Sequence, residues 1–113
     1  MHEVLEISKI LSDNEQFLDD NIVKIYLFGS FARGEQTVYS DIDIALVYKN
    51  SHTVIRGAAH KFKTAVEDAM QESLREIGWF TTNEYNLGKS EDIFNTNTRI
   101  REEGILLWKR IVI

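Results

Sequence analysis

The sequence predicts an α/β fold in which helices pack on one face of a small mixed sheet. Two short apolar runs rich in β-branched and aromatic residues, 22–28 and 42–48, are typical of buried strands. Apolar residues at helical spacing precede the first run and follow the second. The 113 residues contain no Pro- or Ser-rich linker and no internal repeat, so we expect one domain over residues 1–113.

The first half of the chain divides into a helix and two strands. Apolar residues from Glu3 to about Phe17 recur at helical spacing, which predicts an amphipathic helix. The turn-forming residues 19–21 end this pattern. The strand Ile22–Phe28 ends at a glycine, and the second strand, Ile42–Tyr48, is followed by Lys-Asn-Ser. We expect both strands to be largely buried.

The second half is expected to supply a long helix, a third strand and short helices. Apolar residues of the segment Val54–Ile77 form one stripe at helical spacing, and Gly78 is the expected stop. Trp79–Leu87 is rich in aromatic residues and threonine, which favours a third strand. A helix start is expected at residues 90–92, and another helical turn at Thr98–Glu103.

Composition and charge exclude several classes of protein. The chain has no cysteine, which removes disulfides, thiolate catalysis and cysteine-ligated zinc. No apolar run approaches the ~20 residues of a transmembrane helix. The N-terminal residues lack the layout of a signal peptide, so we expect a cytoplasmic protein. A formal net charge of -5 argues against a dedicated nucleic-acid-binding protein.

Residues 27–34 have the features of a phosphate-binding turn. Gly29 and Ser30 directly follow the first strand, where a glycine lets the backbone turn and come close to a ligand. Residues 30–33 are expected to form a helical turn whose amides point at an anion, with Arg33 placed to reach a phosphate. Taken alone, a Gly-Ser pair is more often an ordinary junction between a strand and a loop.

Two aspartates open the second strand. Side chains two residues apart on a strand point to the same face, so Asp41 and Asp43 are expected to project together. Two close carboxylates repel each other unless a cation lies between them, and Mg²⁺ bound by carboxylates and substrate phosphates is the usual solution. Taken alone, an Asp-x-Asp pair is more often a turn residue followed by a solvated charge at a strand edge.

The whole segment resembles the signature of the minimal nucleotidyltransferases of the polymerase-β-like superfamily. That signature is Gly-Ser, ten residues, then Asp-x-Asp followed by aliphatic residues, and Gly29-Ser30, residues 31–40 and Asp41-Ile-Asp43 match it. The resemblance implies a polymerase-β-palm-like fold and nucleotidyl transfer from a substrate such as ATP. Asp41 and Asp43 would then bind two Mg²⁺ ions, while Gly29 and Ser30 would hold the triphosphate.

The family also carries a third carboxylate on the strand after the long helix. Glu84 is the acidic residue of the expected strand 79–87, where aspartate is more usual. If this segment is extended, Phe80, Thr82, Glu84 and Asn86 share a face, and Glu84 could join the two aspartates as a third metal ligand. The alternative is a solvated glutamate.

Chains of this length resemble the antitoxin members that pair with a helical HEPN-type toxin and adenylylate one of its tyrosines. We therefore expect AMP transfer from ATP to such a partner. The apolar segment Ile105–Ile113 fits a partner surface, or else a last strand followed by a tail packed on the core. A catalytically weak module that neutralises its partner by contact is the alternative, and modification of a small molecule ranks lower. The sequence leaves homo- and hetero-oligomers open.

Overall fold

The computed structural model describes residues 2–71 and 75–111, in which four strands form a single mixed sheet. The strands are β1 (Ile22–Phe28), β2 (Ile42–Tyr48), β3 (Ile77–Asn83) and β4 (Ile105–Lys109), in the spatial order β3-β2-β1-β4. β1 runs antiparallel to both β2 and β4, whereas β3 runs parallel to β2. The predicted mixed sheet is confirmed, and β1 and β2 have the predicted bounds.

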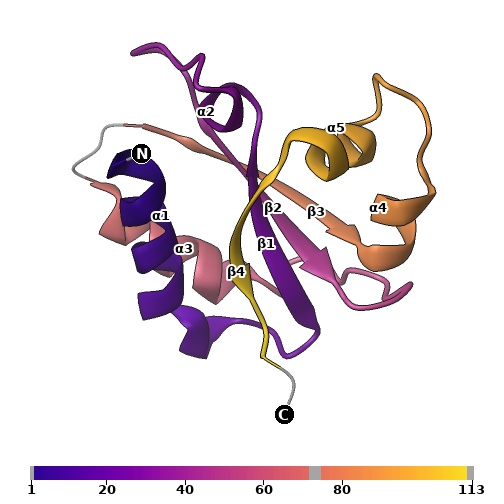
Figure 1. The fold of residues 1–113 in the computed structure, drawn as a ribbon. Helices are drawn as coiled ribbons and strands as arrows, with labels where there is room; N and C mark the ends of the chain where they lie inside the picture. Colours follow the sequence, from indigo (N-terminus) through magenta and orange to yellow (C-terminus); the bar gives the residue numbers. More distant parts are fainter. Residues whose placement is uncertain (1, 72–74, 112–113) are drawn as a thin grey trace.

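Helices α1 (His2–Asp13) and α3 (His60–Ala69) lie on one face of the sheet (Figure 1). They enclose the main hydrophobic core with the side chains that β1 and β2 direct to this face. Leu11, Ile25, Ile44, Leu46 and Phe62 are fully buried there. Burying side chains of this size stabilises the fold by roughly 1.5–3 kcal/mol each.

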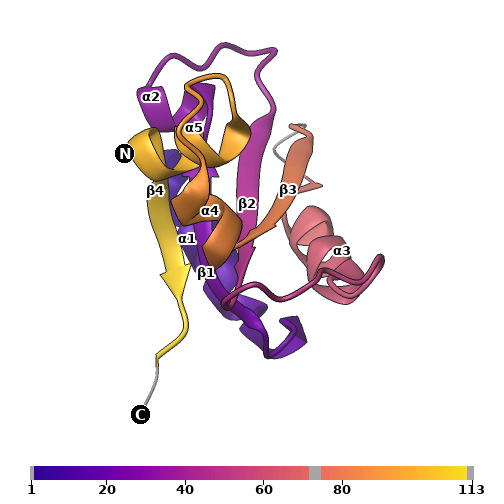
Figure 2. The ribbon, with the colours of Figure 1, turned by 90° about the vertical axis from the view of Figure 1, so that its right-hand side faces the viewer.

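Helices α4 (Glu84–Lys89) and α5 (Thr96–Glu103) lie on the opposite face (Figure 2). Ile100 of α5 is fully buried against Phe28 and Ala45 in a second, smaller cluster. The expectation that helices cover one face alone is therefore incomplete. The sequence pattern missed the second layer because α5 has a polar composition and anchors itself mainly through one isoleucine.

The expected long helix is shorter than its pattern indicates. The structure begins α3 at His60, after a turn in which Gly57 has a φ of 85°. Ile55, which belongs to the predicted apolar stripe, is 70% exposed. Ile77 and Gly78 belong to β3 instead of ending a helix, and residues 72–74 of the prediction lie outside the described residues.

The other element boundaries also differ from the predictions. The N-terminal helix ends at Asp13, and residues 15–17 form a separate 3₁₀ turn. α5 begins at Thr96 and not near residue 90, because the side chain of Asn95 caps it by accepting a hydrogen bond from the amide of Asn97 at 2.8 Å. The start of the apolar C-terminal segment is the edge strand β4, while residues 112–113 lie outside the described range.

Candidate active site

The turn after β1 has the backbone geometry that the sequence predicts. Gly29 adopts φ 72° and ψ −153°, a conformation that residues with a side chain rarely adopt. Helix α2 (Ser30–Arg33) follows directly, and Gly34 closes it in the left-handed region with φ 71°. The first amides of a helical turn have no acceptor within the helix, so those of Ser30 and Phe31 are suited to anion oxygens.

Asp43 lies beside this turn, near the start of β2. Its Cα partners are Phe28 on β1 and Gly78 on β3. A Cβ atom built on Gly78 would lie 2.8 Å from Asp43 Oδ1, and one built on Gly29 would overlap Asp43 Oδ2. The carboxylate therefore occupies the space that side chains at these two glycines would fill.

The surroundings of Asp43 disfavour its negative charge. Partial burial raises the pKa of this carboxyl above its ordinary value, and the nearby charge of Asp41 raises it further. The positive charges of Arg99 and Arg33 act in the opposite direction. A cation held between the two carboxylates would relieve their repulsion, so this pair of oxygen donors fits Mg²⁺ completed by substrate phosphates.

Asp41 is exposed and immediately precedes β2. The structure thus brings the predicted turn of Gly29 and Ser30 together with both aspartates at one end of the sheet. Asp41 is the more accessible of the two carboxylates, whereas Asp43 is half-buried. The site is open to solvent at Asp41.

Arg33 is engaged by two glutamates. Its Nε donates to Glu35 Oε2 and its Nη1 to Glu103 Oε1, each at 3.0 Å. The hydrogen bond to Glu35 contributes most to raising the pKa of Arg33. In this arrangement Arg33 links α2 to the end of α5, and its contact with a phosphate stays a prediction.

The structure does not bring Glu84 to the aspartates. β3 ends at Asn83, and Glu84 is the first residue of α4. Because Asn83 pairs with Tyr48, Glu84 lies beyond the end of β2 opposite to Asp43, where its Oε1 accepts a hydrogen bond from Asn50 N at 2.8 Å. The prediction that Glu84 joins Asp41 and Asp43 as a third metal ligand is wrong, because the parallel register pairs Asp43 with Gly78 and places Glu84 six residues further along, at the other end of the two strands. Within the described ranges, no three His, Cys, Asp or Glu side chains form a group able to hold a metal.

Arg99 is a positively charged residue near Asp43 that sequence reasoning missed. It lies on α5, close enough to Asp43 to lower that carboxyl's pKa, and its Nε is 3.7 Å from Glu103 Oε1. No local signal distinguishes it, because its placement depends on α5 packing over the sheet through Ile100. Phe28 and Phe80 pack together beneath α5, next to Ile100, with their ring centroids 6.3 Å apart.

No helix of the described residues is both long and apolar enough to cross a membrane.

Comparison with known proteins identifies the family of the chain. The nucleotidyltransferase domain family matches residues 4–106. A Methanocaldococcus jannaschii protein named "putative protein adenylyltransferase" is 43% identical over 54 residues, which cover 46% of this chain and 54% of the relative. The match thus spans about half the length of that curated relative.

Two solved structures share the fold. A chain from a toxin–antitoxin structure with AMP-PNP is 25% identical, with a TM-score of 0.56 over 90% of this chain and 69% of the other. A chain from the tri-AMPylated Shewanella oneidensis HEPN toxin in complex with MNT antitoxin is 22% identical, with a TM-score of 0.52 over 97% and 74%. With the family match extending over most of its length, this chain belongs to the nucleotidyltransferase domain family.

Proposed function

We propose that this protein catalyses Mg²⁺-dependent transfer of AMP from ATP to a hydroxyl group of a partner protein. The observation that carries the proposal is the placement of Asp43 between Gly29 and Gly78, next to Asp41 and directly beside the turn at Ser30. This arrangement combines two acidic oxygen donors with backbone amides suited to phosphate.

The chemistry is an in-line displacement at the α-phosphorus. The acceptor oxygen forms a bond to this phosphorus, the bond to the β-phosphate oxygen breaks, pyrophosphate leaves, and the acceptor proton passes to solvent. Bound Mg²⁺ would neutralise charge on the attacking and leaving oxygens. Asp41 and Asp43 would hold two ions, the turn at Gly29 and Ser30 would orient the triphosphate, and Arg99 would offset negative charge from α5.

The acceptor we favour is a tyrosine on a HEPN-type toxin, which this protein would silence as an antitoxin. The solved structures of a toxin–antitoxin with AMP-PNP and of an AMPylated HEPN toxin support this choice. Exposure of Asp41 suits an acceptor carried on another protein's surface. The cytoplasmic location expected from the sequence would give such a pair access to ATP.

A second candidate is a module that binds and neutralises its partner without transfer. One observation favours it: the β3 residue opposite Asp43 is a glycine, and Glu84 lies at the other end of the sheet. Neither β3 nor the start of α4 thus supplies a third carboxylate beside Asp41 and Asp43. This candidate predicts that Asp43→Ala still neutralises the partner and that ATP is not needed.

The test measures transfer of labelled AMP from ATP to a purified helical HEPN-type toxin. We expect Asp41→Asn and Asp43→Asn each to lower the rate on the order of 100-fold or more while circular dichroism stays unchanged. Wild-type rates in both variants would refute the catalytic assignment. Neutralisation without detectable transfer by the wild-type protein would establish the binding module instead.

A further inference from the structure

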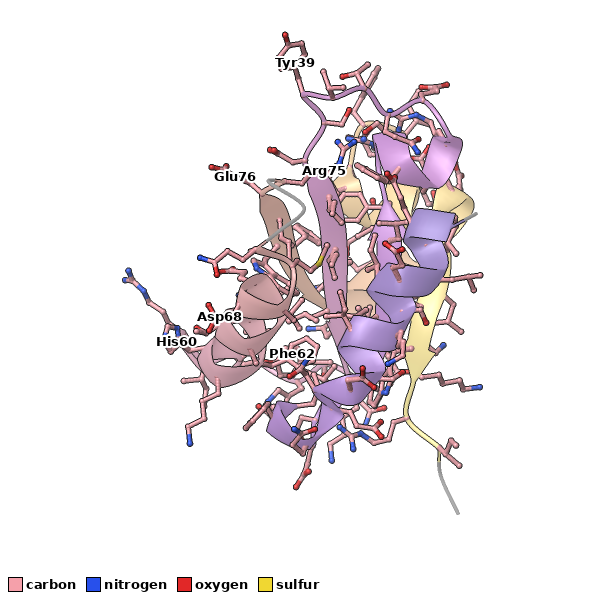
Figure 3. The ribbon with its side chains drawn as sticks, turned by 90° about the vertical axis from the view of Figure 1, so that its left-hand side faces the viewer. Tyr39, His60, Phe62, Asp68, Arg75 and Glu76 are labelled. Atoms are coloured by element: carbon pink, nitrogen blue, oxygen red, sulfur yellow. The ribbon has the colours of Figure 1, made fainter. Side chains whose placement is uncertain are left out.

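We infer that Arg75 is a positioning residue that holds Asp41 in place for the metal. The inference rests on the proposed function, because it takes Asp41 to be a metal ligand. Arg75 lies just before β3, at the end of the sheet that carries both aspartates. Figure 3 shows it beneath the loop that carries Tyr39, on the same side as Glu76.

Arg75 contacts the backbone on the N-terminal side of Asp41. Its Nη1 donates hydrogen bonds to Thr37 O at 2.9 Å and to Ser40 O at 3.0 Å. The Ser40 carbonyl belongs to the peptide group that joins Ser40 to Asp41. Fixing this carbonyl therefore fixes one of the two peptide planes that determine the direction of the Asp41 side chain.

The next residue along the chain holds the other peptide plane. The amide of Ile42 donates to Glu76 O at 2.9 Å, and this amide belongs to the peptide group that joins Asp41 to Ile42. Arg75 and Glu76 therefore hold both peptide groups that flank Asp41. This matters because Asp41 precedes β2 and is exposed, so it lacks the close packing that confines Asp43.

Arg75 also connects this loop to the phosphate-binding turn. Its guanidinium lies 4.8 Å from the ring centroid of Phe31, which is 1% exposed and follows Ser30 in α2. The Arg75 guanidinium thus lies over the ring of the turn and donates N–H hydrogen bonds to the loop. A lysine could supply donors and charge, but it has no planar face to stack on the ring.

The chain offers a matched control at the opposite end of the sheet. Arg110 donates from Nε to Ile22 O at 2.9 Å and from Nη2 to Asp19 O at 3.1 Å. Its guanidinium lies 5.1 Å from the ring centroid of Trp108. Arg110→Ala therefore removes hydrogen bonds to two carbonyls and a ring contact like those described for Arg75, far from the aspartates.

The experiment measures Mn²⁺ affinity in the presence of AMP-PNP by electron paramagnetic resonance, and amide hydrogen exchange at Ile42 in the absence of metal. We expect Arg75→Ala to weaken Mn²⁺ binding about tenfold, typical of residues that orient a metal ligand, and to speed exchange at Ile42. Arg110→Ala should change neither quantity. Arg75→Lys should give intermediate values, and it serves as the test variant if Arg75→Ala does not fold.

The outcomes separate this inference from the proposed function. Equal Mn²⁺ affinity and equal Ile42 exchange in the Arg75 and Arg110 variants would overturn the role of Arg75 alone. A wild-type protein that binds no Mn²⁺ with AMP-PNP would overturn the proposed function, and the role of Arg75 with it.

Discussion

Asp43 and Gly78 face each other across β2 and β3, and the missing side chain of Gly78 leaves the space that the Asp43 carboxylate occupies. The two residues are 35 positions apart in the sequence and adjacent in the sheet. Gly78 on β3 therefore helps to form the surroundings of the half-buried Asp43. The sequence pattern instead predicts that Gly78 ends a helix.

Gly78→Ala should displace the Asp43 carboxylate, because the new Cβ would lie 2.8 Å from Oδ1. Gly78 has no positive φ, so its backbone accepts alanine and the effect comes from this contact. We expect a loss of about 1–3 kcal/mol in unfolding free energy, typical of overpacking, together with slower AMP transfer. Chemical denaturation and the transfer assay measure the two effects.

The control for this substitution is Gly88→Ala, since a Cβ at Gly88 meets no atom within 4 Å. In an Asp43→Ala background the cost of Gly78→Ala should fall close to zero, because the crowded carboxylate is gone. An equal cost in both backgrounds would show that Gly78 acts independently of Asp43.

Asp43→Asn should stabilise the metal-free protein at neutral pH. Burial and Asp41 raise the pKa of Asp43 above the ordinary 3.8, so folding favours its protonated form. The stability that this group contributes is fully present below pH 3.8 and is lost as the pH rises through the folded-state pKa. The variant should therefore melt at a higher temperature than the wild type at pH 7 in EDTA.

The difference in melting temperature between the two proteins should shrink as the pH falls toward 3.8, where the wild-type carboxyl becomes protonated. Added Mg²⁺ should raise the melting temperature of the wild type more than that of Asp43→Asn. A variant less stable than the wild type at neutral pH would contradict the unfavourable environment of the Asp43 charge.

Glu84→Gln should leave AMP transfer at the wild-type rate, because Glu84 lies beyond the end of β2 opposite to the aspartates. Glu84→Ala should cost about 0.5–1.5 kcal/mol of stability through loss of the hydrogen bond from Asn50 N. Parallel transfer and denaturation assays separate the two effects. Loss of transfer in Glu84→Gln, on the scale of Asp43→Asn, would show that this glutamate reaches the site.

Ile100→Ala should lower the free energy of unfolding and also weaken ATP binding. Ile100 is fully buried and anchors α5 against β1 and β2, so its truncation should cost about 2–4 kcal/mol. Because α5 also carries Arg99, the KM for ATP should rise. Ile93, on the loop before α5, is 67% exposed, so Ile93→Ala is the control and should change neither quantity.

The sequence predicts best those parts of the molecule that local rules determine. β1 and β2 are mostly apolar runs bounded by turn residues, and the turn at Gly29 needs a residue without a side chain. For these elements the chain's own covalent and steric preferences are sufficient. That Asp41 and Asp43 point to the same side stays a prediction, because β2 begins at Ile42, one residue after Asp41.

The remaining features depend on which segments pair over long distances. Gly78 follows a helical pattern, yet its position opposite Asp43 is set by the parallel register of β2 and β3. Glu84 continues an extended pattern, yet the side chain of Asn83 accepts a hydrogen bond from the Asn86 amide at 2.8 Å and starts a helix there. Strand pairing at Gly78 and a helix cap at Glu84 thus override the spacing of apolar residues in the sequence.

The pairing of β1 with β4 also bears on how the protein is made. Leu27 pairs with Ile105, so a newly synthesised chain leaves that edge of β1 open until the residues of β4 have emerged from the ribosome. The bridge from Arg33 to Glu103 joins the same early and late parts of the chain. The segment that carries Gly29, Asp41 and Asp43 therefore lacks its outer strand and its link to α5 until residues 103–109 have been synthesised, and the site is complete only when β4 docks.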